Sequence, residues 1–485
     1  MALRLRAAYL AVAASFAWLI GLWVPRRIIG GDTPYLVDGT DALAKCLSRH
    51  DLVACGFTGH LSAAGQMGPI GPYPLLQYVP DFLARSLGAT HHSRYAVLAL
   101  LSTLAVVAAL LLAWVVLSRV GLRPWIWGFF IVVLSGPLLV YANTTWVEML
   151  AGGLLVFLAA AAVLPAPPPV VAVAAFAACL TKETSYPFVA AIGLLGLVLA
   201  RRRTGSPIRR HVLFGAAGIA VGFGCAALFN VLRFGSVENT NYLQSEYRTP
   251  LGRIPEFAAG LFVAPNGGIL FFWPVAALLM AAMVVLPFVR RGARFDRKVA
   301  LALAAIVIGL TLGLASWYSP FGWIAWGPRL SLPWVLPLVL LGLAAFGKPL
   351  GALAARLLAP GWRLVLVALA LVAVTLPQVG YMWRRETLDA FFALSLKNEH
   401  CTAASGPGGS SDYFACLHET MWQRRSIIND ALSGLGEPAG AVTAVVVAAG
   451  LLGCLALLRD GLRSRGDVAG QVVVEQVDGQ RPEAV

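Results

Sequence analysis

The most regular feature of the sequence is a succession of long apolar runs separated by polar stretches. Most runs span about 17 to 23 residues, the length that an α-helix needs to cross a hydrocarbon layer about 30 Å thick. The pattern predicts an all-α polytopic membrane protein with about twelve transmembrane helices. The predicted helices lie near 7–24, 95–118, 124–140, 148–164, 168–180, 186–200, 212–232, 268–289, 299–317, 330–347, 362–380 and 439–458.

The polar stretches divide the chain unequally. The first, 25–94, is far longer than a helix connection requires, which is typical of a functional loop. Within it, GPIGPYPLLQYVPDFLARSLG at 68–88 predicts extended chain followed by an amphipathic helix at the membrane surface. We expect a transmembrane catalytic module at 1–347, C-terminal helices at 348–458 with an outer cap at 381–438, and a disordered cytoplasmic tail at 459–485.

Composition and charge agree with a membrane protein. The 485 residues are 59% hydrophobic and 12% charged, with a mean hydropathy of +0.77, whereas soluble domains carry about 25% charged residues. With the N-terminus placed in the cytoplasm, the inner segments hold 21 Lys and Arg against 6 acidic residues, and the outer segments 16 against 17. The densest basic runs, at 201–210 and 290–298, fall in short inner loops. The net charge of +14 therefore reports topology, and nucleic acid is not an expected partner.

The cysteines and the N-terminus fit the same topology. Cys46 and Cys55 fall in the first outer loop, and Cys401 and Cys416 in the last. Two pairs on the oxidising side suggest two local disulfides, with free thiols as the alternative. No small-residue cleavage site follows the first apolar run, which predicts a retained signal anchor. The excess of Arg over Lys, 32 to 5, is typical of GC-rich genomes, so we expect a bacterial inner membrane with both termini cytoplasmic.

The stretch PRRIIGGDTPYLVDGTD, at 25–41, follows the first apolar run directly. Thr33 and Pro34 are typical of an N-cap and of the first helical position, so we expect a helix to begin here. Asp32 then stands at a helix N-terminus beside the bilayer surface. Two interpretations are open: a capping carboxylate worth about 1 kcal/mol, or a catalytic base for a substrate whose reactive end lies at the membrane face.

Few other ionisable residues interrupt the apolar runs. Glu148 lies in NTTWVEML, and Lys182 and Glu183 lie in TKETSYPF. Because a charge at mid-bilayer costs about 2.5 to 3.5 kcal/mol, these side chains should face protein, water or substrate; the alternative for Lys182 is snorkelling to the surface. Arg329 is the sole cation of SWYSPFGWIAWGPR at 316–329. A guanidinium there can bind phosphate through two charge-assisted contacts.

Other signals limit the chemistry. LFVAPNGGILFFWP at 261–274 predicts a broken helix start, where backbone groups must be satisfied by protein or ligand. No His or Cys cluster has metal-ligand spacing, and the sequence contains neither a P-loop nor a Gly-rich dinucleotide turn. We therefore expect no cofactor, and a divalent metal is not indicated.

The distribution of ionisable residues favours an enzyme at the outer membrane face. A transporter more often carries charges near the midplane and has two matching halves. Here the charges collect at the outer face, and the loops of the two halves differ in length. An enzyme at this interface would act on an amphipathic substrate with a polar reactive head.

Five motifs occur in order along most of the chain: GDT-x-Y at 31–35, GPYPLLQYVP at 71–80, TKET at 181–184, APNGGILFFWP at 264–274 and WGPRLSLP at 326–333. In this order and topology, the chain resembles the bacterial polyprenyl-phosphate-sugar-dependent glycosyltransferases of the GT-C superfamily, which are similar in plan to protein mannosyltransferases. The resemblance extends to about residue 340. One departure is Thr33, which follows Asp32 where many of these enzymes carry a second acid.

The resemblance implies transfer of a sugar from a polyprenyl-phosphate donor to an extracytoplasmic glycan, lipid or protein, with inversion at the sugar. Asp32 would act as the base, and Lys182 and Arg329 would bind the donor phosphate. With a monophosphate carrier, a metal is dispensable. The substrate pocket would include Tyr35, Asp38, Tyr73, Glu148, Glu183, Asn266 and Trp326.

Three alternatives remain from the sequence. A lipid-linked glycan flippase or other transporter would have an aqueous cavity with midplane charges. A membrane scaffold would tolerate replacement of the outer carboxylates. A glycan ligase or polymerase would be expected to carry its main active loop later in the chain.

Overall fold

The computed structural model describes residues 2–22, 33–48, 74–181, 186–234, 236–237, 248–289, 296–317, 321, 326–383, 411–422, 428 and 431–478. Within these ranges the regular structure is helical, and the only bridge joins Arg248 to Trp317. Seven of the described helices are long and apolar enough to cross a membrane, and four shorter helices are also apolar. The predicted all-α polytopic class is confirmed, since each of the twelve predicted apolar runs coincides with one helix or with two consecutive helices.

The helices follow the predicted runs closely. In chain order the α-helices are α1 (Ala2–Gly21), α3 (Thr33–Ser48), α5 (Leu75–Ser86), α6 (His91–Arg119), α7 (Pro124–Leu134), α8 (Leu138–Tyr141), α9 (Glu148–Val163), α10 (Pro168–Cys179), α11 (Tyr186–Thr204), α12 (Arg209–Phe234), α13 (Ile254–Val263), α14 (Ile269–Phe272), α15 (Pro274–Val289), α16 (Arg297–Ala315), α17 (Leu332–Leu358), α18 (Gly361–Trp383), α21 (Ser411–Trp422) and α23 (Pro438–Asp478). Three 3₁₀ turns join them: η3 (Leu251–Arg253), η4 (Arg329–Ser331) and η5 (Leu432–Gly436).

Two of the predicted runs are broken at prolines, which cannot donate a backbone hydrogen bond. Pro137 separates α7 from α8, and Pro274 separates α14 from α15. The two breaks fit together, because the indole of Trp273 donates to the Val132 carbonyl in α7 at 2.7 Å. Gly136 leaves room for this indole, since a side chain there would overlap it. The predicted broken helix start at 261–274 is therefore confirmed, and its partner is a second broken helix.

The centre of the bundle is formed by α9 and α17. α9 packs against α6, α10, α11 and α17. In the most apolar 18-residue stretch of Arg329–Leu358, 83% of the residues are buried inside the protein. α12 covers α10, while α1 packs against α23, which in turn contacts α7 and α18. α6, α12 and α18 carry exposed apolar side chains, such as Leu111, Leu213 and Leu369 respectively. Exposed apolar side chains form the surface expected toward lipid.

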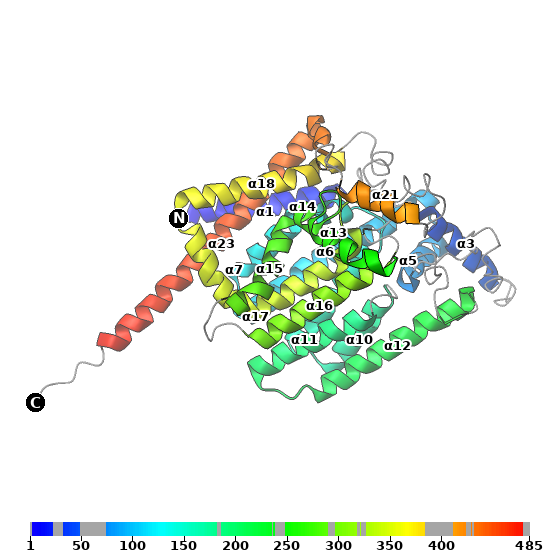
Figure 1. The fold of residues 1–485 in the computed structure, drawn as a ribbon, viewed down its shortest axis with the longest axis horizontal. Coiled ribbons are helices and arrows are strands. Elements are labelled where there is room, and N and C mark those ends of the chain that lie inside the picture. The colour runs from blue at the N-terminus through cyan, green and yellow to red at the C-terminus, as the bar shows by residue number, and fades with distance from the viewer. Residues whose placement is uncertain are drawn as a thin grey trace, which may run out of the picture.

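Helices from the first and last predicted outer segments lie at one end of the bundle (Figure 1). α3, α5 and α21 lie at the end opposite the first turn of α1 and the last turns of α23 (Figure 1). Both described chain ends therefore lie on one side, as the predicted topology requires; which compartment that side faces stays a prediction. α3 and α5 share a small apolar cluster with α6 and α12, formed by Leu36, Tyr78, Leu98 and Phe229.

α5 has the amphipathic character expected of the 68–88 stretch. Gln77 and Asp81 face the protein, whereas Val79, Leu83 and the following Leu87 are exposed. α3 begins at Thr33, as predicted.

The C-terminal segment differs from the expectation. We expected no fixed structure after residue 458, but α23 continues as a helix to Asp478. The segment 441–478 contains no proline, and extending an existing helix avoids the costly nucleation step. α23 therefore extends into the predicted tail, while the division of the chain into module, C-terminal helices and tail stays a prediction.

Small residues allow close packing of α10 and α12. A side chain at Gly218 would overlap the Ala172 backbone of α10. We expect Gly218→Ala to force these helices apart and to lower the free energy of unfolding by about 1 to 3 kcal/mol. Gly224→Ala, on the same helix with nothing within 4 Å of its Cβ position, is the matched control. Thermal unfolding in detergent should give a lower Tm for Gly218→Ala only; equal Tm values would contradict the packing.

Candidate active site

Two charged side chains meet inside the bundle at the end where the loop helices lie. Arg329 Nε is 3.3 Å from Glu148 Oε1, and the two side chains are 8% and 3% exposed. The Arg329 guanidinium carbon also lies 5.1 Å from the centre of the Trp146 ring, within the range of a cation–π contact. Since removing either partner of a buried ion pair is costly, each charge requires the other. The prediction that Glu148 faces protein, water or substrate is met by this protein contact.

Local structure places both partners. Glu148 is the first residue of α9, where the helix dipole favours a carboxylate. Arg329 begins η4, directly after Gly327 with φ +67° and Pro328. Any side chain at Gly327 would meet the Phe272 ring at 2.7 Å, so glycine is required both by the backbone and by this contact.

The tryptophan of the WGPR motif anchors this turn. Tyr141 in α8 accepts a hydrogen bond from the Trp326 backbone N–H at 2.9 Å and donates to its carbonyl at 3.1 Å. The Trp326 indole donates to Gln378 Oε1 at 2.6 Å, and Gln378 in turn donates to the Phe272 carbonyl. The Trp326 ring is fully buried and stacks on Tyr381 with 4.2 Å between centroids. Trp326 thus holds the Arg329 turn against α8, α14 and α18.

The first outer loop reaches this site through Thr145. Thr33 Oγ1, at the start of α3, lies 2.5 Å from Thr145 Oγ1. Gln77 of α5 donates to the Thr145 carbonyl at 3.4 Å. Thr145 immediately precedes Trp146, and Glu148 follows three residues later.

A fourth predicted segment also adjoins this region. The Leu76 backbone N–H in α5 donates to the Leu180 carbonyl at 3.3 Å. Lys182 follows Leu180 by two residues. The described contacts therefore bring together the beginnings of α3 and α5, the 143–148 segment, the end of α10 and the WGPR turn. Described residues of three sequence motifs, Thr33, Gln77 and Arg329, are linked through the 143–148 segment.

Several predicted site residues lie outside the described residues or side chains: Asp32, Tyr73, Lys182, Glu183 and the Tyr35 side chain. Their roles stay predictions. Asp38 is exposed on α3. Asn266 is buried and donates to the Thr420 carbonyl at 3.0 Å, which ties the turn before α14 to α21.

Polar residues that the sequence analysis did not select hold the loop helices in place. Arg94, in the first turn of α6, donates from Nε and Nη2 to Asp81 of α5 at 2.8 and 2.7 Å. Its Nη1 donates to Asp41 of α3 at 2.9 Å, and Arg85 also donates to Asp41. Asp81 and Arg94 are visible in the sequence as charges of a loop, but nothing in their spacing marks them as buried.

Asp41 has a shifted acidity. Burial raises the pKa of the Asp41 carboxyl, but the hydrogen bonds from Arg85 and Arg94, the Arg94 charge and the His91 contact lower it by more. The net pKa lies below its ordinary value of 3.8. The folded state thus favours the charged form of this carboxyl.

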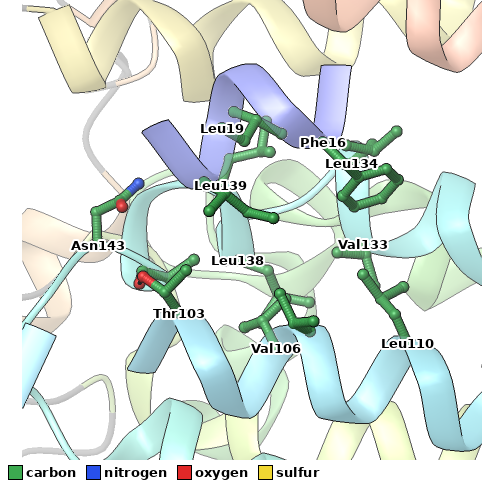
Figure 2. Close-up of a pocket in the computed structure, with 13 residues that line it drawn as sticks. Phe16, Leu19, Thr103, Val106, Leu110, Val133, Leu134, Leu138, Leu139 and Asn143 are labelled. Carbon is green, nitrogen blue, oxygen red and sulfur yellow. Dashed lines mark hydrogen bonds between the residues drawn. The ribbon is translucent and has the colours of Figure 1, made fainter. Parts of the chain in front are cut away.

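An apolar crevice adjoins the same 143–148 segment (Figure 2). It lies between α1, α6 and the α7–α8 break, is partly open to the surroundings, and has a cavity volume of only about 30 Å³. Thr103 and Asn143 are its polar residues, and the rest of the lining is hydrocarbon.

Among the described residues, no group of three His, Cys, Asp or Glu side chains could hold a metal ion. The expectation of a metal-independent site stays a prediction. Cys416 in α21 is disulfide-bonded, and its partner lies outside the described residues. The pairing of Cys416 with Cys401 and of Cys46 with Cys55 therefore stays a prediction.

Comparison with known proteins gives limited likeness. No protein-family description matches the chain, and no curated protein matches it. Two solved structures of ArnT from Cupriavidus metallidurans are similar in fold. The form bound to undecaprenyl phosphate has 16% identity and a TM-score of 0.45 over 96% of this chain and 79% of ArnT. The apo form has 16% identity and a TM-score of 0.46 over 92% and 77%. At these scores the likeness carries no conclusion about function.

The Asp41 contacts predict a defined acid sensitivity. Because the folded pKa is lowered, the stabilisation is complete above pH 3.8 and is lost as the pH falls through the folded pKa. We expect Asp41→Asn to lower the Tm at pH 5 to 7, and the difference from the native chain to shrink below pH 3.8. Asp38→Asn, on the exposed side of α3, should change the Tm little at any pH. A constant difference for Asp41→Asn across the acid range would contradict the assignment.

Proposed function

We propose that the protein is a membrane glycosyltransferase of the GT-C type, which transfers a sugar from a polyprenyl-phosphate donor to an extracytoplasmic acceptor. Asp32 is the general base, and Arg329 together with Lys182 binds the donor phosphate. The proposal rests on the five sequence motifs and is supported by the contacts that link Thr33, Gln77 and Arg329 through the 143–148 segment.

One observation carries the proposal furthest. The Thr33–Thr145 contact brings the residue after Asp32 to a segment whose Glu148 holds Arg329. Thr33, which follows the candidate acid in the sequence, and the buried Arg329 of the WGPR turn thus both contact the segment 145–148. In a chain with few charges in its apolar runs, such a convergence favours a chemical site over a lone helix cap.

The reaction follows from these groups. Asp32 accepts the proton of the acceptor hydroxyl while its oxygen attacks the anomeric carbon from the face opposite the phosphate. The bond between the anomeric carbon and the phosphate oxygen breaks, and the electron pair leaves with polyprenyl phosphate. This leaving group is a stable anion, so it needs a fixed cation more than a proton donor. Glu148 and the Trp146 ring hold the Arg329 guanidinium in one orientation for that role.

The base is tested by Asp32→Asn in the full chain, purified in lipid nanodiscs. Turnover of polyprenyl-phosphate sugars should fall by about 10² to 10⁴, because the amide cannot accept the proton. Sugar transfer is measured with radiolabelled donors and a panel of glycan, lipid and protein acceptors. Asp460→Asn, which replaces a carboxylate of α23, is the matched control and should retain native turnover.

Two results would contradict this assignment. Native turnover in Asp32→Asn would exclude Asp32 as the base. Movement of a lipid-linked glycan between leaflets by the native chain, without transfer to any acceptor, would instead favour the flippase alternative.

The phosphate role of Arg329 is tested without leaving a buried charge unpaired. The double variant Glu148→Gln and Arg329→Gln removes both charges of the ion pair. Loss of a charged hydrogen bond of about 2 kcal/mol predicts roughly 30-fold weaker binding of polyprenyl phosphate. Binding is measured by titration calorimetry, with the native chain as the comparison. Unchanged affinity in the double variant would remove Arg329 from the phosphate site.

A further inference from the structure

The first turn of α6 contains a buried arginine that faces two other helices. Arg94 has a side chain 2% exposed, and the Asp81 side chain that it meets is fully buried. The contact is bidentate, with Arg94 Nε and Nη2 on the two Asp81 oxygens. This geometry gives the strongest and most directional pairing available to an arginine.

The position of Arg94 does not stabilise α6, the helix to which it belongs. A cation in the first turn of a helix is disfavoured by the helix dipole. Thr90 already caps α6 by accepting from the Ser93 backbone N–H. The position of Arg94 is therefore explained by its partners on α3 and α5.

The same guanidinium holds α3 at two points. Nη2 donates to the Val37 carbonyl at 3.0 Å, and Nη1 donates to Asp41 Oδ1 at 2.9 Å. Residues four apart lie on one face of a helix, so Arg94 fixes both the depth and the rotation of α3. Thr33, one turn before Val37, then meets Thr145 beside the Glu148–Arg329 pair.

We propose that Arg94 is a positioning residue, which sets the place of Thr33 at the start of α3 by holding α3 between Asp81 and the start of α6. The inference rests on the proposed function for its catalytic consequence, but its geometric content does not. Arg94 does not touch the reacting atoms in this account. It acts through α3, whose first residue follows Asp32 in the chain.

The geometric content is tested by cross-linking. Thr33→Cys with Thr145→Cys should form a disulfide readily under mild oxidation, because the two native hydroxyls lie 2.5 Å apart. Adding Arg94→Gln should reduce the cross-linked fraction several-fold. Arg253→Gln is the matched control, since it removes an arginine that pairs with Glu256 on α13. Undiminished cross-linking in Arg94→Gln would overturn the proposal.

The catalytic consequence is tested by separating positioning from stability. In Arg94→Gln, kcat should fall about 10²-fold, as expected for a misplacement near 1 Å, with little change in the KM for the donor. Replacing the whole buried pair by Arg94→Leu and Asp81→Leu removes the unpaired carboxylate and should recover the Tm. Because leucine cannot bond to Val37 and Asp41, kcat should remain low.

The outcomes distinguish the two proposals. Recovery of kcat together with the Tm in the double leucine variant would show that Arg94 is merely structural and would overturn the inference. Absence of sugar transfer by the native chain would count against the proposed function, and cross-linking would still decide whether Arg94 places the start of α3.

Discussion

Within a hydrocarbon layer, every polar group must find its partner inside the protein, and this constraint organises the molecule. The Glu148–Arg329 pair is its plainest expression, since neither charge could be buried alone. The same constraint joins the two broken helices, because the Trp273 indole donates to the Val132 carbonyl. Gln378 likewise satisfies two buried polar groups, because it accepts a hydrogen bond from the Trp326 indole and donates one to the Phe272 carbonyl. Polar contacts thus fix the irregular backbone that lines the candidate site.

These contacts also divide the site into two parts with different support. The Arg329 turn is embedded among stacked and buried aromatic rings of the bundle. The start of α3 is added from outside, through a small apolar cluster and the charges around Arg94. The rigid part suits a fixed cation, whose value depends on its not having to reorient during the reaction. The added part carries the candidate base.

The helices could be predicted from the sequence, but most of the side-chain contacts between them could not. The apolar runs predicted the helices, and the Thr33-Pro34 signal predicted where α3 begins, because both depend on local chemistry. The contact of Arg94 with Asp81 could not be predicted, since it depends on the direction that the chain takes at Gly88, between α5 and α6. Tyr141 and Gln378 were missed because a single polar residue in an apolar run has no pattern around it. The polar composition after residue 458 likewise did not indicate that α23 continues to Asp478.

The few contacts of α3 give it a disproportionate influence. α17 is surrounded by neighbours, so its place is determined many times over. α3 is held by a small cluster with Leu36 and by the bonds to Val37 and Asp41. A helix of 16 residues is about 24 Å long, so a small rotation at its attachment displaces its first residue appreciably. The place of Thr33, the first residue of this helix, is therefore determined by residues that lie one and two turns away from it. Distance from the chemistry is thus a poor guide to importance in this part of the molecule.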